Sequence, residues 1–393
     1  MNRSDIAVIG GGISGLGVAH FGAKAGCTVQ IFEQNKQLGG ALQTKNKDDF
    51  WFELGGHTCY NSYETLIEIL NDLDLFRFVQ LRKQEPFKIW CDGEFRSIFS
   101  QLNKLELLYS LPRSFWTKKK DQTVGSFYGN IVGKNNFTHT LSNIFSAVSS
   151  QSADEFPADL LFKKRPRDKK LPRSFTLSDG LQSIAALIVS HSKIEYKTTC
   201  EVKNIKHKTE GYTIETNLGE TYSSKYLAMA TPPPVAAELL RGISPNLTSH
   251  LKELRCVNVE SIGVAIDAKD LKIKRLSGAI ARDEAFYSMV SRDVVPHKQL
   301  RGFTFHFATN LLNYDEKIDR IADILGIQQH SIKYIKEATN TLPSFRLGHD
   351  KWLARTNQLL NEIDLILTGN YFSGMSIEDC LSRSKQQFFR LFR

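Results

Sequence analysis

Three glycines near the start of the chain have the spacing of a phosphate-binding turn. Gly10, Gly12 and Gly15 follow an apolar run at residues 6–9 and open a helical pattern. Gly10 allows a tight turn from strand to helix, Gly12 lets a pyrophosphate approach the backbone, and Gly15 lets the helix pack close to the sheet. The amino end of a helix also offers free N–H donors and partial positive charge. The pattern therefore predicts a dinucleotide site.

The residues that follow indicate which dinucleotide is bound. Glu33 comes directly after the next apolar run, residues 29–32, and can accept hydrogen bonds from both ribose hydroxyls of an adenosine. An acid at this position disfavours NADP, whose 2′-phosphate calls for an arginine. A second glycine pair, Gly39-Gly40, lets the backbone approach a longer ligand. These features favour FAD over NAD.

The same cofactor is predicted to meet a second motif near the C-terminus. An apolar strand at residues 365–368 leads to Gly369, and Gly374 leaves room for the backbone to reach a flavin ring. Ser376 and Asp379 have the spacing of a capping box. We expect this strand to lie beside the first strand of the chain. The capped helix would direct its positive end at the flavin N1–C2=O edge, where negative charge develops on reduction.

The elements between these motifs indicate a discontinuous domain. Short strands at residues 194–230 return to the α/β pattern of the start. A hairpin is predicted around Asp92-Gly93. Three later runs indicate an antiparallel sheet, at residues 257–267, 287–292 and 302–308. We therefore predict an α/β chain in which a discontinuous Rossmann-type FAD-binding domain carries an inserted α+β substrate domain of antiparallel sheet and helices.

The predicted boundaries divide the 393 residues into five segments, which is enough chain for about two or three domains. The FAD-binding domain takes residues 1–84, 175–240 and 346–393. Residues 85–174 form a helical substrate part that can face a membrane, and residues 241–345 form the substrate sheet.

Two stretches resemble the protoporphyrinogen oxidases of the flavin amine oxidase superfamily. Residues 52–60, FELGGHTCY, are similar to the segment that passes beside the flavin ring, and residues 341–380 are similar to the C-terminal segment. Residues 175–233 also follow the order of motifs in this family. The resemblance implies that FAD is held by residues from several segments: Gly10, Gly12, Ile13, Ser14, Gly15, Glu33, Gln34, Gly39, Gly40, Ala41, Leu42, Gly55, Gly56, His57, Val202, Gly369, Asn370, Gly374, Met375 and Ser376.

The chain departs from the family pattern at three positions. Ala41 stands where many members carry an arginine after the glycine pair, so one expected cofactor contact is absent. Phe87 stands where an arginine that is thought to pair with a substrate propionate usually enters the hairpin. Ser384 replaces a usual glycine in the last helix. These departures leave the glycine motifs intact, and the one at Phe87 removes an expected substrate contact.

The chemistry that the resemblance implies needs few reactive side chains. A flavin accepts a hydride, so no side-chain nucleophile is required, and the sequence shows no Ser-His-Asp arrangement. His57 is the candidate catalytic residue, as a base or a positioning group, with a hydrogen-bonded structural role as the alternative. The candidate substrate contacts are Lys88, Trp90, Arg96 and Tyr371, of which Trp90 and Tyr371 are equally consistent with core packing.

Three functions are consistent with these motifs. The first is an FAD-dependent oxidase that takes hydrides from a porphyrinogen, or from a similar reduced, apolar or carboxylated compound, and passes electrons to O2 or a quinone. The second is a related flavin oxidase or desaturase that acts on an amine or a polyene. The third is a catalytically silent flavoprotein that serves as a binding partner, and the intact motifs at both ends of the chain argue against it.

The net charge and the number and spacing of cysteines indicate which binding partners and which cellular compartment to expect. The net charge of +9 indicates anionic partners, although no nucleic-acid-binding module is recognisable. The basic, aromatic residues 110–120 are candidates for a peripheral contact with the inner face of a membrane, with substrate carboxylates or plain solvation as alternatives. The six cysteines include no CxxC pair, so we predict no metal site and no disulfide framework. With no signal peptide and no apolar run of membrane-spanning length, we expect a cytoplasmic protein.

Overall fold

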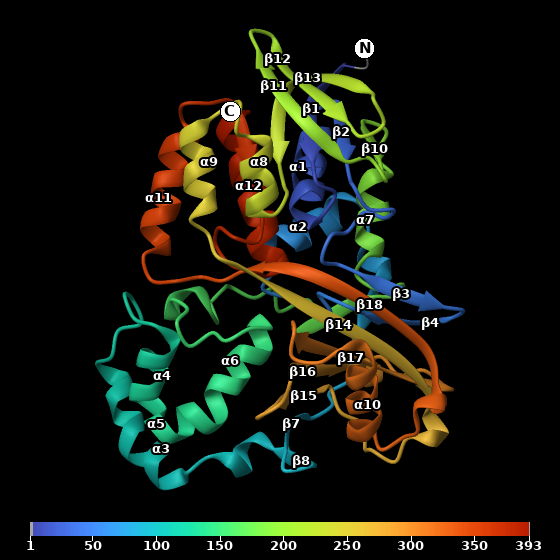
Figure 1. Ribbon diagram of the computed structural model, residues 1–393, viewed down its shortest axis with the longest axis vertical. Coiled ribbons are helices and arrows are strands. Elements are labelled where there is room, and N and C mark those ends of the chain that lie inside the picture. The colour runs from blue at the N-terminus through green and yellow to red at the C-terminus, as the bar shows by residue number, and fades with distance from the viewer. Residues whose placement is uncertain (1–2, 393) are drawn as a thin grey trace.

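The computed structural model describes residues 3–392 and contains two large sheets, one above the other in the view of Figure 1. The first sheet has the strand order β10-β2-β1-β13-β12-β11, with β19 also paired to β13. Strands β10, β2, β1, β13 and β19 run parallel, whereas β11 and β12 are antiparallel. The bounds are β1 (Arg3–Ile9), β2 (Val29–Phe32), β10 (Ile194–Lys197), β11 (Val202–Lys208), β12 (Gly211–Thr216), β13 (Thr221–Met229) and β19 (Leu365–Leu367).

Both faces of this sheet are covered by helices, which is why the carboxyl-terminal parts of its central strands are apolar, at residues 6–9 of β1 and 227–229 of β13. Ile6 and Val8 of β1 point to one face, and Ala7 and Ile9 point to the other. The first face packs against α1 (Ile13–Lys24), α2 (Glu64–Asp72), α7 (Ser183–Val189) and α12 (Ile377–Leu391). The second packs against α8 (Pro233–Leu239), α9 (Pro245–Lys252) and α11 (His349–Leu360). The predicted α/β class with a Rossmann-type half is confirmed.

The place of the last strand differs from the prediction. We expected residues 365–368 to lie beside the first strand, but β19 pairs with β13, where Leu365 is opposite Leu227. Both edges of β1 are already occupied, by β2 and by β13. The antiparallel strand β12 stops pairing with β13 at Ser224, which leaves the outer edge of residues 227–229 open for β19.

The second sheet is mostly antiparallel and has the order β18-β14-β17-β16-β15-β7-β8. The predicted hairpin and the three predicted runs are present, whereas β15 and β18 were not predicted. Helix α10 (Tyr314–Leu325) covers one face through a shared core with Val264, Phe303 and Phe305. The bounds are β7 (Phe87–Cys91), β8 (Glu94–Ser97), β14 (Cys256–Asp267), β15 (Gly278–Ala281), β16 (Phe286–Ser291), β17 (Leu300–Ala308) and β18 (Ile332–Pro343).

Shorter elements join the two halves. Strands β3 (Thr44–Lys47) and β4 (Phe50–Glu53) form a ribbon that presses on the second sheet, because a Cβ on Gly263 of β14 would lie 2.2 Å from Phe52. A small sheet of three strands lies on the other side of β4, made of β5 (Cys59–Tyr60), β6 (Val79–Leu81) and β9 (Ser174–Leu177).

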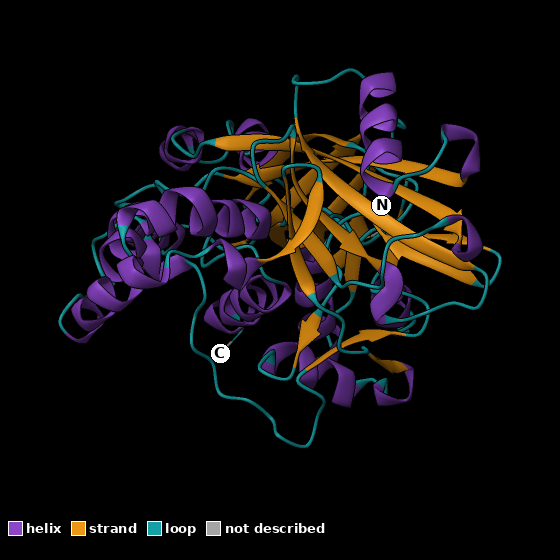
Figure 2. Ribbon diagram, turned by 90° about the horizontal axis from the view of Figure 1, so that it is seen from below, coloured by secondary structure: helices purple, strands orange, loops and turns teal. Residues whose placement is uncertain are grey.

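A separate helical lobe stands beside the second sheet, at the lower left of Figure 1 and the left of Figure 2. It contains α3 (Lys104–Ser110), α4 (Val124–Val132), α5 (Lys134–Asn136) and α6 (Ser142–Ser149). The 3-10 turn η2 (Ile98–Gln101) precedes α3, and the 3-10 turn η3 (Leu111–Phe115) follows it. None of the helices within residues 3–392 combines the length and the hydropathy needed to cross a bilayer. The predicted domain boundaries stay predictions, and the structure places the hairpin β7–β8 in the second sheet.

Candidate functional site

The amino end of α1 provides an open cradle of backbone donors at the carboxyl end of β1. Its N-cap, Gly12, has no side chain to accept a hydrogen bond, and the first turn carries no acidic residue. The first N–H groups of a helix have no partner within the helix, so those of Ile13, Ser14 and Gly15 are available to an anion. Gly10 has a φ of +103°, and a Cβ there would lie 2.7 Å from the Ala230 carbonyl oxygen. The cradle fits a pyrophosphate.

The acid that was predicted to bind the ribose lies at the edge of this cradle. Glu33 accepts hydrogen bonds from the backbone N–H of Gly11 at 2.8 Å and from that of Asn35 at 2.9 Å. These bonds hold its buried carboxylate at the end of β2. Val202 is buried at the start of β11, close to Glu33, because the N–H of Cys200 donates to the Glu33 carbonyl at 2.9 Å. Gln34 is exposed beside them.

The second glycine pair, Gly39-Gly40, contacts the glycine turn at residues 10–12. The N–H of Gly39 donates to the Gly11 carbonyl at 2.8 Å, and a Cβ on Gly40 would lie 2.8 Å from the Cα of Gly12. The loop after β4 joins the same surface, since a Cβ on Gly55 would lie 1.9 Å from the Ala41 carbonyl oxygen. Leu42 packs against the next glycine of that loop, Gly56. Three segments far apart in sequence thus form one surface that a long ligand can follow.

The C-terminal motif approaches from the other side through α12. The capping box is confirmed, because Ser376 Oγ accepts from the Asp379 N–H at 3.1 Å and Asp379 Oδ2 accepts from the Ser376 N–H at 3.3 Å. Ser384 Oγ donates to the Ser14 carbonyl at 2.7 Å, so α12 packs along α1. Helix α12 begins about two turns before that contact and reaches beyond the start of α1. Gly369, Asn370, Gly374 and Met375 lie on the loop that leads into it.

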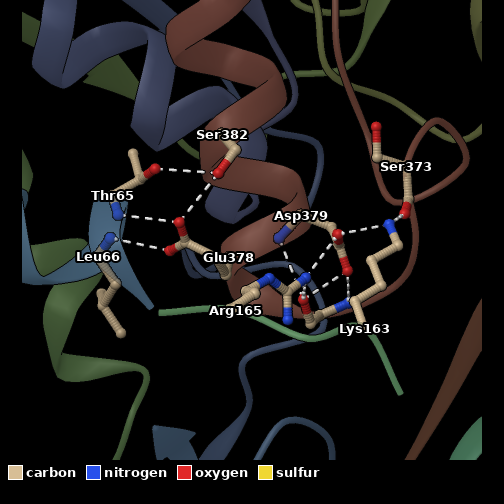
Figure 3. A network of polar contacts seen from close by, with 9 residues as sticks. Thr65, Leu66, Lys163, Arg165, Ser373, Glu378, Asp379 and Ser382 are labelled. Carbon is tan, nitrogen blue, oxygen red and sulfur yellow. Dashed lines mark hydrogen bonds and ion pairs between the residues drawn. The ribbon is translucent and has the colours of Figure 1, made fainter. Parts of the chain in front are cut away.

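Two basic residues that the sequence did not single out lie at the start of α12 (Figure 3). Lys163 Nζ lies 3.0 Å and Arg165 Nη2 2.8 Å from Asp379 Oδ1, and Lys163 also donates to the Ser373 carbonyl. Glu378 accepts from the Thr65 N–H at 2.9 Å, which fixes the start of α2 against α12. Two side-chain cations therefore lie at this helix end, where both pair with the Asp379 carboxylate, so the two charges that they bring are partly neutralised.

A cavity with both apolar and ionisable side chains in its lining lies beside His57, between β4 and the second sheet. It has a volume of about 30 Å³, which is room for about two waters, and Glu53, His57, Arg82, Arg292 and Thr304 are among its lining residues. Beside it, the Lys83 N–H donates to the carbonyl of Val294, one of its lining residues, at 2.7 Å.

His57 is neutral in this setting. Burial and the nearby Arg82 guanidinium lower the pKa of His57 to about 4. Its Nδ1 lies 3.3 Å from the Gly55 carbonyl oxygen. A second histidine, His306 of β17, lies close by, and burial together with His57 lowers its pKa to about 3. His306 Nδ1 lies 2.9 Å from Ser261 Oγ. A neutral imidazole is able to accept a proton.

The two arginines of the cavity have unused hydrogen-bond donors. Arg82 Nη1 donates to Thr58 Oγ1 at 2.5 Å, but Arg82 Nε is buried without a partner among the described residues. Arg292 Nε and Nη1 are likewise buried and unpaired within residues 3–392. The Arg292 guanidinium stacks on Trp51, with Cζ 3.9 Å from the ring centroid. No local pattern marks these two residues, because 210 positions separate them in the sequence.

Glu53 is a buried carboxyl whose pKa is raised to about 7 because burial disfavours its charged form. It accepts from the Leu181 N–H at 2.7 Å and from Thr44 Oγ1 at 2.8 Å, and both bonds oppose the rise. Below pH 7 the folded protein therefore holds a proton here that the unfolded chain releases near pH 4.5.

We expect this carboxyl to make stability fall with rising pH. A raised folded-state pKa stabilises the protein fully below pH 4.5, and the effect is lost as the pH rises through about 7. We compare the free energy of unfolding of the wild type with that of Glu53→Gln. The difference, wild type minus variant, should decrease by about 3 kcal/mol between pH 4.5 and about 7. Urea titrations of both proteins measure the difference, in which the histidine contributions cancel. A difference that does not change with pH would contradict the raised pKa.

The structure does not bring the predicted substrate contacts to His57. Lys88 and Trp90 lie on β7, three strand positions from β17, which is about 14 Å, and Arg96 lies on β8, one position farther away. Trp90 Nε1 donates to Glu284 at 2.9 Å, and Arg96 pairs with Asp92 at 2.8 Å. Tyr371 is fully buried in the core of the first sheet.

Sequence comparisons identify the family. The family model for flavin-containing amine oxidoreductases matches residues 13–325. A Dictyostelium discoideum protein described as "Probable flavin-containing monoamine oxidase A" is 24% identical over 292 residues, which cover 64% of this chain and 61% of that protein. A 4,4′-diapolycopene oxygenase of Methylomonas sp is 37% identical over 91 residues, 22% of this chain and 18% of that protein. The chain thus matches less than two thirds of the length of these relatives.

Solved structures share the fold over the whole chain. A protein from Exiguobacterium sp. 255-15 described as "Putative protoporphyrinogen oxidase" has a TM-score of 0.80 at 15% identity, covering 99% of this chain and 98% of that one. A reduced UDP-galactopyranose mutase has a TM-score of 0.77 at 13% identity, covering 99% and 95%. The matching family model and the cradle at α1 together show that the chain belongs to the flavin-containing amine oxidoreductases, with FAD as its cofactor.

Proposed function

We propose that the chain is an FAD-dependent oxidase that removes hydrides from an apolar, carboxylated substrate of the porphyrinogen type and passes electrons to O2 or a quinone. The observation that carries this proposal is the pair of arginines with unpaired donors beside His57. The protein described as "Putative protoporphyrinogen oxidase", which shares the fold, is consistent with it.

Buried guanidinium donors without a partner are costly, and a carboxylate is the group that best satisfies them. The cavity has room for a carboxylate group rather than for a whole substrate, so the apolar body of the substrate would lie outside it. The same positive charge opposes an ammonium group, which disfavours an amine. An uncharged polyene would leave both arginines unsatisfied.

The protein's own residues have three tasks in this reaction. Bound FAD supplies the hydride acceptor. Arg82 and Arg292 orient the substrate through its carboxylate, and neutral His57 accepts a proton from the carbon or nitrogen that is oxidised. The amino end of α12, where Lys163 and Arg165 pair with Asp379, would direct its helix dipole at bound FAD and would favour negative charge there.

Anaerobic reduction of the bound flavin tests the proposal. Protoporphyrinogen or coproporphyrinogen should bleach the visible flavin absorbance, and an alkyl ester of the same porphyrinogen should do so with much lower affinity. Bleaching by an amine or a polyene but by no porphyrinogen would overturn the substrate assignment. Flavin that none of these donors reduces would favour the silent binding partner.

We expect Arg292→Ala to raise the KM for the carboxylated substrate by about 10- to 100-fold and to change kcat less, because a charged hydrogen bond to substrate is lost. Arg292→Lys should restore only part of the affinity, since lysine lacks the planar fork. Steady-state kinetics with the acid and its ester separate the two contributions. Arg241→Ala, an exposed arginine paired with Glu238, is the matched control. An equal rise in KM for acid and ester would contradict carboxylate binding by Arg292.

A further inference from the structure

The outer end of the helical lobe carries a cluster of exposed apolar side chains, which we call the lobe patch. Phe115 is 88% exposed, Phe99 80% and Tyr109 78%. Large apolar residues rarely gather in this way on a protein that has no partner there. The members of the lobe patch lie on η2, α3, η3 and the next residue: Phe99, Leu105, Leu108, Tyr109, Leu111, Phe115 and Trp116.

The lobe patch is one face of α3 extended by the turn that follows it. Leu105, Leu108 and Tyr109 have the spacing i, i+3, i+4, which places them on the same side of the helix. The apolar stripe of a surface helix normally faces the core. In α3 the buried residue is Ser110, and the large apolar side chains face outward. The helix therefore presents a hydrophobic face that nothing within residues 3–392 covers.

Positive charge surrounds this face. Lys104, Arg113, Lys118 and Lys120 are exposed within or directly after the lobe patch. Residues 99–121 contain five basic and two acidic residues. One of the acids, Glu106, is occupied, because its carboxylate accepts from the Asn135 N–H at 2.9 Å and from the Asn136 N–H at 2.8 Å. The face thus combines apolar bulk with a cationic rim.

We propose that the lobe patch docks the protein on the surface of an anionic bilayer. Apolar side chains enter the boundary between headgroups and acyl chains, Tyr109 and Trp116 lie at headgroup level, and the lysines contact lipid phosphates. A second copy of the chain is a poorer occupant of the lobe patch. A symmetric dimer would place the cationic rim of one protomer beside the same cationic rim of the other, and these like charges repel. Figure 1 shows α3 at the end of the molecule farthest from the first sheet, so docking leaves the cofactor half free.

The intrinsic tryptophans give a direct test with the FAD-loaded full chain. Trp116 is exposed, whereas Trp51, Trp90 and Trp352 are buried. Vesicles of phosphatidylcholine and phosphatidylglycerol should protect the exposed indole from acrylamide quenching and sediment with the protein. Vesicles of phosphatidylcholine alone should do so much less, and added salt should release the protein. In Trp116→Phe the protein should still sediment with the vesicles, but the change in quenching should be lost.

Two paired variants separate the apolar and the charged contributions. Phe115→Ser/Trp116→Ser should lower the vesicle partition coefficient at least about tenfold, because two large side chains no longer leave water. Lys118→Glu/Lys120→Glu should also lower it at least about tenfold on anionic vesicles. Leu311→Ser, at an exposed leucine outside the lobe patch, should change nothing. Unchanged flavin content and melting temperature show that each variant is folded.

Two results would overturn the proposal. The first is wild-type protein that stays in the supernatant with anionic vesicles at low salt. The second is a dimer in sedimentation velocity without lipid that dissociates in Phe115→Ser/Trp116→Ser, because that result would assign the lobe patch to a second copy of the chain. Neither result bears on flavin reduction, so docking and the proposed oxidase function fail independently.

Discussion

Gly12→Ala is expected to fold like the wild type and to lose most of its FAD. The backbone of Gly12 has a φ of −74°, which alanine adopts without strain. A Cβ there would meet no protein atom closer than the Cα of Gly40, at 3.6 Å, which is an ordinary van der Waals distance. The added methyl group instead takes space above the free N–H groups of α1, where a phosphate must approach. The substitution should therefore weaken FAD binding without changing the folding of the protein.

The measurement is flavin absorbance per mole of protein after gel filtration, together with the melting temperature of the flavin-free protein. Loss of even one charged hydrogen bond to a phosphate should weaken FAD binding by about tenfold or more. Gly242→Ala is the control, because no atom lies within 4 Å of the Cβ it would add. A Gly12→Ala protein that keeps full flavin content would show that the pyrophosphate does not lie over α1.

Arg301→Ala should cause the largest loss of stability among single substitutions of charged residues in the second sheet. Arg301 and Asp293 are only 7% and 2% exposed, and they form two bonds, Nε to Oδ1 at 2.8 Å and Nη2 to Oδ2 at 2.6 Å. Removal of the arginine leaves a buried carboxylate without its cation, which costs about 3–5 kcal/mol. Asp293 lies on η7 (Arg292–Val294), so Arg292 should lose its fixed position as well.

Urea titration of the FAD-loaded protein measures this loss. Arg301→Ala/Asp293→Ala should recover part of the stability, because no uncompensated charge remains buried. Arg96→Ala, which breaks an exposed ion pair on the hairpin β7–β8, should cost less than about 1 kcal/mol and serves as the control. Equal losses for the buried and the exposed arginine would contradict the importance of burial at this site.

Motifs that are local in sequence could be predicted, because backbone geometry alone decides them. The glycines at positions 10, 12 and 15 require a particular turn, and the pair Ser376–Asp379 requires a particular helix start, so a few neighbouring residues determine each feature. The α/β class and the antiparallel sheet followed from apolar periodicity in the same way.

Features that depend on distant residues or on edge positions could not be predicted. Strand β18 pairs only with β14 and carries many polar side chains, so it lacks the alternation by which strands are recognised. Lys163 meets Asp379 across 216 positions, and Arg82 shares a cavity with Arg292 across 210. Only the packing of β4 and the small sheet against the second sheet creates that cavity. The glycine turn and the capping box could therefore be predicted from the sequence, whereas the residues that line the cavity could not.

The discontinuous build of the first sheet has a consequence for folding during synthesis. Helix α1 emerges from the ribosome long before α12, but one of its flanks is covered by α12, where Leu381 and Ser384 approach Gly17. Likewise, the outer edge of β13 stays unpaired at residues 227–229 until β19 has been synthesised. Such long-range pairings slow folding and leave apolar surface exposed in the nascent chain. The cofactor cradle can therefore mature only after residues 365–391 have left the ribosome, so we expect FAD to be captured after that point and the growing chain to depend on chaperones until then.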